Sequence, residues 1–207
     1  MPSIYQLKPA FQQLLRPLVR RLFKIGVTAN QVTVLAALIS ILLGALVGCF
    51  ASHSWIFAAL PVWMLLRMTL NAIDGMLARE FDQQSTVGAY LNELGDIVAD
   101  IALVVPFALI PGVSSFAVFT VISLAIVSEY SGVLGPMVGA SRRYDGPMGK
   151  SDRAFAISLL CIGIALGWIA GVWIDAALIL VSLLLIHTSI NRVRMGLKEA
   201  QEQAAKA

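Results

Sequence analysis

Eight residues near the middle of the chain have the types and spacing needed to bind a metal ion or a phosphate group. They are Asn71, Asp74, Gly75, Ala78, Arg79, Gly88, Asn92 and Asp96. Strongly apolar segments flank this run on both sides. Ionisable groups inside a membrane are energetically expensive, so such residues point first to a functional role.

The polar residues of this run fall into two stripes with helical spacing. The first stripe joins Arg67, Asn71, Asp74 and Ala78 at intervals of four, three and four residues, and the second repeats at every fourth residue. The second stripe contains Gly88, Asn92, Asp96 and Asp100. Residues three or four positions apart share one face of a helix, and a short loop makes consecutive helices antiparallel neighbours. The two stripes are therefore expected to converge, and their oxygen atoms suit a hard cation such as Mg²⁺, Mn²⁺ or Ca²⁺.

Small residues and one arginine surround the first carboxylate. Gly75 and Ala78 flank Asp74 with minimal side chains, which would let a bulky ligand approach the helix backbone. Arg79 carries a fixed positive charge suited to a phosphate group.

Composition identifies the chain as a membrane protein. Of its 207 residues, 58% are hydrophobic and 13% are charged, its mean hydropathy is +0.83, and a soluble domain has about 25% charged residues. Cys49 and Cys161 lie in apolar runs and form neither a disulfide framework nor a metal-binding spacing. The first apolar run begins near Val32, too late for a cleavable signal peptide.

Six apolar segments are long enough to span a bilayer as helices of about 20 residues. They cover residues 32–50, 55–73, 89–110, 114–138, 154–172 and 174–190. The expected fold is therefore an all-α integral membrane protein with six transmembrane helices. Pro61 and Pro106 lie inside two of these segments and are expected to kink them.

The distribution of basic residues predicts the orientation. The short breaks at residues 51–54, 111–114 and 173–175 contain no Lys or Arg, whereas the opposite set of connections and both termini are basic. By the positive-inside rule, both termini are cytoplasmic. We expect an integral protein of the cytoplasmic (inner) membrane of a bacterium.

Residues 1–27 are expected to form an amphipathic interfacial helix before the first span. Phe11, Leu14, Leu15, Leu18, Leu22 and Phe23 recur at helical spacing. Arg16, Arg20, Arg21 and Lys24 line the opposite side. A basic amphipathic helix lies in the membrane interface and favours anionic lipids. Thr28 and Gln31 have the spacing of a capping box that opens the first span. Residues 28–195 would form the transmembrane catalytic domain and residues 196–207 a polar C-terminal tail.

The eight residues resemble the signature of the CDP-alcohol phosphotransferase family, D-x2-D-G-x2-A-R-x8-G-x3-D-x3-D. Six of the eight positions match at the correct spacing, and the first and third Asp positions are occupied by Asn71 and Asn92. The resemblance extends to the six spans, the interfacial helix, the Thr28-Ala-Asn30 entry to the first span, and a basic loop with Gly149, Lys150 and Arg153. It therefore covers nearly the whole chain.

The resemblance implies a reaction and a set of roles. Members of this family transfer the substituted phosphoryl group of a CDP-linked donor to an alcohol and release CMP; in phospholipid synthesis the donor is CDP-diacylglycerol. One or two Mg²⁺ or Mn²⁺ ions would be bound at Asn71, Asp74, Asn92 and Asp96, and Asp96 would be the general base. The residues implied to bind the CDP donor are Asn30, Gly75, Ala78, Arg79 and Gly88.

The resemblance also implies partners. Arg142, Arg143, Lys150 and Arg153 would bind a phosphate of the acceptor or of lipid, and glycerol 3-phosphate is one acceptor that fits such a group. Serine and inositol phosphate remain alternatives. Family members are usually dimers, and Gly44 and Gly48 form a GxxxG pair that is compatible with close helix contact or a dimer interface.

The two Asn residues leave three outcomes open. In the first, the metal is bound more weakly, because an amide oxygen ligates a hard cation without contributing charge. In the second, Asp100 or Glu93 compensates as a nearby acid. Alternatively, catalysis has been lost and the protein binds CDP-lipid or a partner without turnover.

A transporter or proton relay through Asp96, Asp100 and Glu129 is the third hypothesis. It predicts acids spread across the membrane, whereas the sequence concentrates them at the cytoplasmic ends of the spans. We interpret Glu129 as a structural partner of Ser131 or of nearby backbone, with a role in the site as the alternative. No nucleic-acid-binding module is evident in the sequence, and the positive charge follows the membrane topology.

Overall fold

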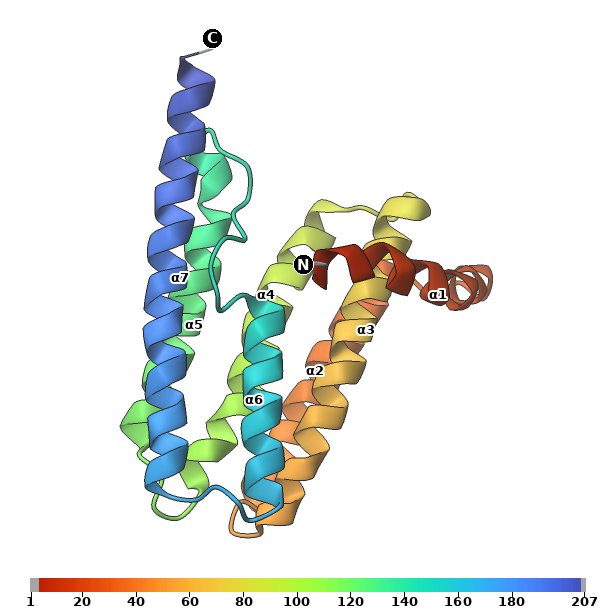
Figure 1. Cartoon of the computed structure of the whole chain (residues 1–207). Helices are drawn as coiled ribbons and strands as arrows, with labels where there is room; N and C mark the ends of the chain where they lie inside the picture. Colours follow the sequence, from red (N-terminus) through yellow and green to blue (C-terminus); the bar gives the residue numbers. More distant parts are fainter. Residues whose placement is uncertain (1–3, 206–207) are drawn as a thin grey trace. The chain divides into compact units, whose positions relative to one another are not determined.

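The computed structural model describes residues 4–205, and these residues form helices joined by turns and loops, with no β-strand (Figure 1). The α-helices are α1 (Ile4–Lys24), α2 (Ala29–Cys49), α3 (Ala59–Glu80), α4 (Thr86–Val104), α5 (Ser115–Val133), α6 (Lys150–Ala165) and α7 (Val172–Ala204). Three short 3₁₀ helices connect them: η1 (Ser54–Ala58), η2 (Val105–Leu109) and η3 (Gly135–Val138). The expected all-α class is confirmed.

The chain forms two compact units, and three of the long helices contribute to both. The first unit contains Met1–Leu42 and Leu65–Ala99, and the second contains Leu43–Met64 and Asp100–Ala207. Helices α2, α3 and α4 are each divided between the units. The eight signature residues all belong to the first unit.

In the first unit, α1 crosses the end of α3 (Figure 1). Its buried residues Leu15 and Val19 join a core with Val32 of α2 and with Ile73 and Leu77 of α3. The rings of Phe23 and Phe81 stack with centroids 4.4 Å apart. This packing fixes α1 to the same hairpin that carries the signature.

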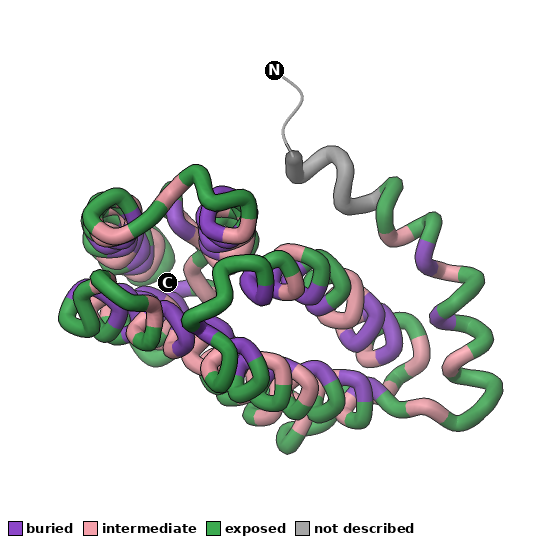
Figure 2. Tube along the Cα trace, turned by 90° about the horizontal axis from the view of Figure 1, so that it is seen from below, coloured by how far each residue is buried: buried purple, intermediate pink, exposed green. Residues whose placement is uncertain are grey.

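Several other apolar side chains in the described part of α1 stay exposed, as the alternation of colours along this helix in Figure 2 illustrates. Phe11, Leu14 and Leu18 are exposed, and Leu14 retains 75% of its accessible surface. A helix with a buried strip and a second, exposed apolar strip suits a position in the membrane interface. That location stays a prediction.

In the second unit, α5 and α7 pack along each other and α6 packs against η1. The rings of Phe57 in η1 and Phe107 in η2 meet edge to face with centroids 5.3 Å apart. Helix α7 continues to Ala204, so the described part of the polar tail extends this helix.

Four helical segments of the described residues are long and apolar enough to span a membrane. They are Ala29–Cys49, Ser54–Glu80, Ser115–Val133 and Val172–Ala204. The other two predicted spans correspond to α4, which carries Glu93, Asp96 and Asp100, and to α6, which has 16 residues. The count of six spans therefore stays a prediction.

Both prolines lie close to a junction between an α-helix and a 3₁₀ helix, and the kinks expected inside the spans stay predictions. Pro61 is in the first turn of α3, directly after η1. Pro106 lies in η2, directly after α4 ends at Val104. A proline that follows a helix blocks its continuation.

The predicted capping box at the start of α2 is confirmed. The backbone N–H of Thr28 donates to the Gln31 side chain (2.9 Å), and the N–H of Gln31 donates to Thr28 Oγ1 (3.3 Å). This reciprocal pair satisfies two N–H groups that have no acceptor within the helix.

Gly44 packs against backbone inside the second unit. A Cβ added at Gly44 would overlap the carbonyl oxygen of Ala102 and lie 2.7 Å from its carbonyl carbon. A Cβ at Gly48 would lie 3.4 Å from the tip of Leu109, which is an ordinary contact. The GxxxG pair thus serves contacts within the chain.

We expect Gly44→Ala to lower the thermal unfolding midpoint of the purified protein clearly more than Gly48→Ala. Overpacking against backbone typically costs about 1–3 kcal/mol, and the carbonyl of Ala102 cannot rotate away as a side chain can. Unfolding of both variants in the same detergent measures the difference. Equal midpoints would contradict the close packing at Gly44.

Candidate active site

The signature stripes lie on two helices of one hairpin in the first unit. Helix α3 carries Asn71 and Asp74, and α4 carries Asn92 and Asp96. Asn71 and Asn92 are the same number of residues from the turn at 81–82, and so are Arg67 and Asp96. Asp82 has a φ of 52°, a left-handed conformation that Asp tolerates better than most residues. The ion pair between Arg67 of α3 and Asp96 of α4 joins the two stripes.

A cavity of about 330 Å³ opens between α2, α3, α4 and the loop that joins α3 to α4. Its lining residues are Ala29, Asn30, Thr33, Asp74, Gly75, Ala78, Arg79, Gln83, Gln84, Ser85, Gly88, Ala89, Asn92 and Glu93. Its volume falls within the range of about 300–1,000 Å³ that is usual for small-ligand sites. All five residues expected to bind a CDP donor line it.

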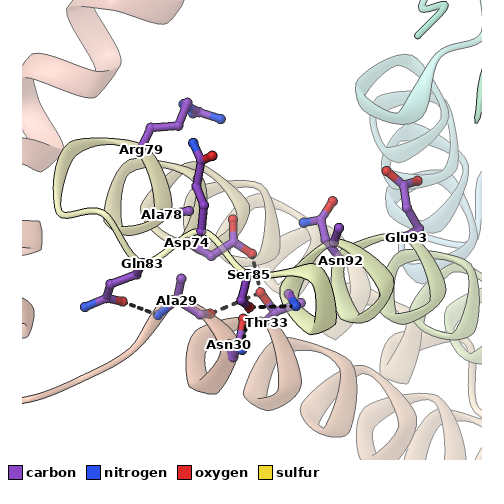
Figure 3. A pocket seen from close by; sticks show the side chains of 14 residues that line it. Ala29, Asn30, Thr33, Asp74, Ala78, Arg79, Gln83, Ser85, Asn92 and Glu93 are labelled. Atoms are coloured by element: carbon purple, nitrogen blue, oxygen red, sulfur yellow. Dashed lines mark hydrogen bonds between the residues drawn. The ribbon is translucent and has the colours of Figure 1, made fainter. Parts of the chain in front are cut away.

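Asp74 is the buried carboxylate of the cavity. The residue is 3% exposed, and its Oδ2 accepts a hydrogen bond from Thr33 Oγ1 at 2.8 Å (Figure 3). Thr33 comes from α2, so three helices shape this part of the site. Sequence reasoning did not identify Thr33, because its partner is 41 residues away and no local motif links the two.

Ser85 organises the N-terminus of α4. Its Oγ accepts from the N–H of Gly88 at 2.9 Å, which is the geometry of a helix N-cap, and from Asn30 Nδ2 at 3.4 Å. A Cβ at Gly88 would lie 2.6 Å from Asn30 Oδ1 and 2.9 Å from Ser85 Oγ, so a larger residue here would displace these side chains. Sequence analysis missed Ser85, although a Ser directly before a predicted helix is a recognised cap signal.

Gln83 also comes from the connecting loop, and its side-chain oxygen accepts from the N–H of Ala29 at 2.7 Å (Figure 3). The loop thereby caps the start of α2 as Ser85 caps the start of α4. Two helix N-termini, where anions bind favourably, therefore border the same cavity.

Arg79 folds back over Gly75. A Cβ at Gly75 would lie 2.8 Å from Arg79 Nη2 and 3.2 Å from Nη1. The glycine thus leaves room for a guanidinium group over the helix backbone, at the wall of the cavity. An arginine in this position can pair with phosphate oxygens in a bidentate manner.

Asp96 is held by an arginine of the opposite helix. Arg67 Nη2 donates to Asp96 Oδ1 and to the Asp96 carbonyl oxygen, both at 3.1 Å. Arg67 is 5% exposed. Neither Asp96 nor Asn71 is among the residues that line the cavity, whereas Asn92 and Glu93 are.

The side chains at the four candidate metal-binding positions fit a hard cation only in part. Among residues 4–205 no group of three or more His, Cys, Asp or Glu side chains could hold a metal ion. The four signature positions supply two carboxylates and two neutral amides. Asp74 with the oxygen of Asn92 can serve one hard cation.

The chain matches the family model for CDP-alcohol phosphatidyltransferase over residues 26–188. The protein belongs to this family. The resemblance inferred from the signature is therefore confirmed. The chain is 41% identical over 202 residues to the inner membrane protein YnbA of Escherichia coli K12. The alignment covers 97% of this chain and 99% of that protein.

A more distant relative and two solved structures agree with the family. Archaetidylinositol phosphate synthase of Aeropyrum pernix is 29% identical over 119 residues, 52% of this chain and 61% of that protein. The phosphatidylinositol phosphate synthase PgsA1 of Mycobacterium tuberculosis with CDP-DAG bound aligns with a TM-score of 0.70 at 17% identity, covering 89% of this chain and 94% of that one. The structure of the same enzyme in complex with manganese and citrate aligns with a TM-score of 0.67 at 18% sequence identity. That alignment covers 87% of this chain and 88% of that one. At these identities the likeness to PgsA1 shows the fold.

The four basic residues expected to bind an acceptor phosphate belong to the second unit. Arg143 pairs with Asp145 at 2.8 Å and with Glu199, and the hydrogen bond with Asp145 raises the pKa of Arg143 above its usual value. The guanidinium of Arg142 lies 5.0 Å from the ring centre of Tyr144. Lys150 begins α6.

Arg153 belongs to a buried network in the same unit. It donates to Glu129 Oε1 at 2.9 Å and to Asp100 Oδ2 at 2.8 Å. Arg192 and Arg142 approach the other oxygen of Glu129 at 3.5 and 3.8 Å. The expectation that Glu129 pairs with Ser131 is wrong, because Ser131 Oγ donates to the carbonyl of Val127. Asp100 lies in this network, and Glu93 lines the cavity.

We expect Glu129→Gln to destabilise the protein strongly. Removing one charge from a buried, hydrogen-bonded ion network typically costs about 3–5 kcal/mol, because the partner charges are left uncompensated. Glu80→Gln is the matched control, since it removes the same charge from the exposed pair with Arg16. Thermal unfolding should separate the two variants, and a midpoint for Glu129→Gln equal to that of Glu80→Gln would contradict a stabilising role for the network.

Proposed function

We propose that this protein is a membrane enzyme that transfers the substituted phosphoryl group of a CDP-linked donor to an alcohol and releases CMP. The observation that carries this proposal is the cavity, because Gly75, Ala78, Arg79 and Gly88 of the family signature line it together with the buried Asp74. The proposed donor is CDP-diacylglycerol, which fits the CDP-DAG bound to PgsA1.

The reaction assigns one role to each polar group. Arg79 and the N-terminus of α4 would bind the diphosphate of the donor, and Asn30 and Gly88 would border the nucleotide. Asp96 would take the proton of the acceptor hydroxyl while the oxygen of that hydroxyl attacks the β-phosphorus. The bond from the β-phosphorus to the oxygen of CMP breaks, and CMP leaves with the electron pair.

Mg²⁺ or Mn²⁺ is the proposed cofactor, with Asn71, Asp74, Asn92 and Asp96 as the candidate ligand positions. A divalent ion bound there would offset negative charge on the phosphoryl oxygens. Glu93 is the nearer of the two compensating acids in this proposal, since it lines the cavity and Asp100 is paired with Arg153.

The proposed membrane arrangement has six spans, with α4 and α6 added to the four long apolar segments. Both termini would be cytoplasmic, and α1 would lie in the interface with its exposed Leu14 among lipid chains. This division keeps residues 1–27 as the interfacial helix, 28–195 as the catalytic domain and 196–207 as the tail. A homodimer is proposed as in the family.

The acceptor is proposed to be a small alcohol, with glycerol 3-phosphate as the first choice. Arg142, Arg143, Lys150 and Arg153 would bind its phosphate. Their carboxylate partners, Glu129 among them, would orient the guanidinium groups before the acceptor arrives.

The second candidate function is a non-catalytic relative that binds CDP-lipid or a partner. It is favoured by Asn71 and Asn92 and by the pairing of Asp96 with Arg67. It predicts donor binding without CMP release. A transporter that uses Asp100 and Glu129 is disfavoured, because both carboxylates are paired with Arg153.

CMP release tests the proposal directly. Purified protein in lipid or detergent receives CDP-diacylglycerol, Mg²⁺ or Mn²⁺, and one acceptor at a time: glycerol 3-phosphate, serine or inositol phosphate. Metal-dependent CMP release with one acceptor would support the transferase and identify its product. Donor binding without release in any mixture would support the non-catalytic relative.

We expect Asp96→Asn to abolish CMP release and to leave CDP-donor binding within about twofold. Asparagine keeps the size of the side chain and its hydrogen bond with Arg67 but cannot accept the proton of the acceptor. Asp82→Asn, in the turn of the same hairpin, is the matched control and should retain activity. Undiminished release by Asp96→Asn would exclude Asp96 as the general base.

A further inference from the structure

We propose that Thr33 of α2 is a positioning residue of the cavity. Its hydroxyl group fixes the buried carboxylate of Asp74 in the orientation in which that carboxylate binds a divalent cation. This inference rests on the cation requirement of the proposed function, and it concerns a residue outside the signature, on a helix that carries none of the eight signature positions. Metal binding tests it without any turnover.

The hydrogen bond between Thr33 and Asp74 carries the first step. Thr33 Oγ1 lies 2.8 Å from Asp74 Oδ2, and both residues line the cavity. In Figure 3 the second carboxylate oxygen of Asp74 points away from Thr33. A hydrogen bond to one oxygen restricts the rotation of the whole carboxylate group, so it also sets the direction in which the other oxygen can meet a ligand.

The hydroxyl group of Thr33 has two acceptors within reach, and the carboxylate is the stronger one. A hydroxyl group donates one hydrogen atom, and Thr33 Oγ1 also lies 3.1 Å from the carbonyl oxygen of Ala29 on its own helix. Thr69 and Thr120 bond in this way to the carbonyl four residues before them, as threonine often does inside a helix. Hydrogen bonds to an ionised acceptor are shorter and stronger, so the shorter distance favours Asp74 as the acceptor.

The methyl group of Thr33 faces the other helix of the hairpin. A Cβ added at Gly95 of α4 would lie 3.8 Å from Thr33 Cγ2, which is an ordinary van der Waals distance. The two branches of this side chain therefore reach α3 through the hydroxyl group and α4 through the methyl group. A β-branched side chain has little rotational freedom, so the hydroxyl group is in place before a ligand arrives.

A hydrogen bond of this kind is common among carboxylates that bind metal ions. The partner residue orients the carboxylate, and its loss typically lowers metal affinity or activity about 10–100-fold. Asp74 is 3% exposed, and its partner Thr33 comes from a different helix. Asp74 has a further interaction besides this bond, so Thr33 orients the carboxylate and does not by itself compensate its charge.

The alternative explanation is that Thr33 only packs α2 against the hairpin. The two explanations differ in which branch of the side chain matters. If Thr33 orients Asp74, metal affinity follows the hydroxyl group, whereas a packing role follows the methyl group. Valine replaces the hydroxyl group by a second methyl group, serine keeps only the hydroxyl group, and alanine keeps neither, so these substitutions separate the two roles.

The experiment measures Mn²⁺ affinity, from the paramagnetic resonance signal of free Mn²⁺, with full-length protein in detergent. The proteins compared are wild type, Thr33→Val, Thr33→Ser, Thr33→Ala and Thr69→Val. Thr69→Val is the matched control, since it removes a hydroxyl group that bonds within its own helix, from α3 of the same unit.

We expect Thr33→Val to bind Mn²⁺ at least tenfold more weakly than wild type, because the carboxylate of Asp74 loses the hydroxyl group that orients it. Thr33→Ser and Thr69→Val should stay within threefold of wild type. Equal affinities of Thr33→Val and wild type would overturn the proposal. So would a tenfold loss in Thr33→Ser or in Thr69→Val, or no Mn²⁺ binding by wild type.

A second comparison applies if Thr33→Val does not fold, which its thermal unfolding without metal reveals. Thr33→Ala and Thr33→Ser differ only in the hydroxyl group, so Thr33→Ala should bind Mn²⁺ at least tenfold more weakly than Thr33→Ser. Equal affinities of these two variants would overturn the proposal. Because no donor or acceptor is present, an inactive protein can still support this inference, and an active one can still contradict it.

Discussion

Charge compensation within each unit is the constraint on which the structure depends. Helices this apolar offer little water to solvate an ionised side chain, so each buried charge needs a partner from a neighbouring helix. In the first unit Arg67 of α3 meets Asp96 of α4. In the second, Arg153 of α6 joins Asp100 to Glu129 of α5. Each pair joins different helices, so the charges also fix which helices are neighbours.

The cavity depends on the short loop between α3 and α4. Asp82 adopts the left-handed turn, Gln83 caps α2 and Ser85 caps α4. Gln83 reaches the first turn of α2 and Ser85 reaches Asn30, so the loop joins α2 to the hairpin of α3 and α4. The loop therefore helps to form the cavity, even though the family signature contains none of its residues.

The sequence predicted the parts of the site that repeat along one helix. The spacing of Asn71 and Asp74, the small residues at 75 and 78, and the capping box at Thr28 are local patterns, and a helix has a fixed period. Thr33 and the partners of Glu129 could not be predicted, because they depend on which helices meet. Helix boundaries were also beyond local patterns: Pro106 lies in η2, directly after α4 ends at Val104, rather than inside one long helix.

The two Asn residues and Arg67 form one change in the chemistry of the hairpin. Asp at positions 71 and 92, as in the family signature, would add two negative charges to this hairpin, and nearby like charges repel where water is scarce. Asn71 and Asn92 add none, and the Asp96 carboxylate is paired with Arg67 across the hairpin. The packing of α3 against α4 therefore contains its own charge compensation. A hairpin of this kind differs from sites in which a bound metal supplies the folding energy.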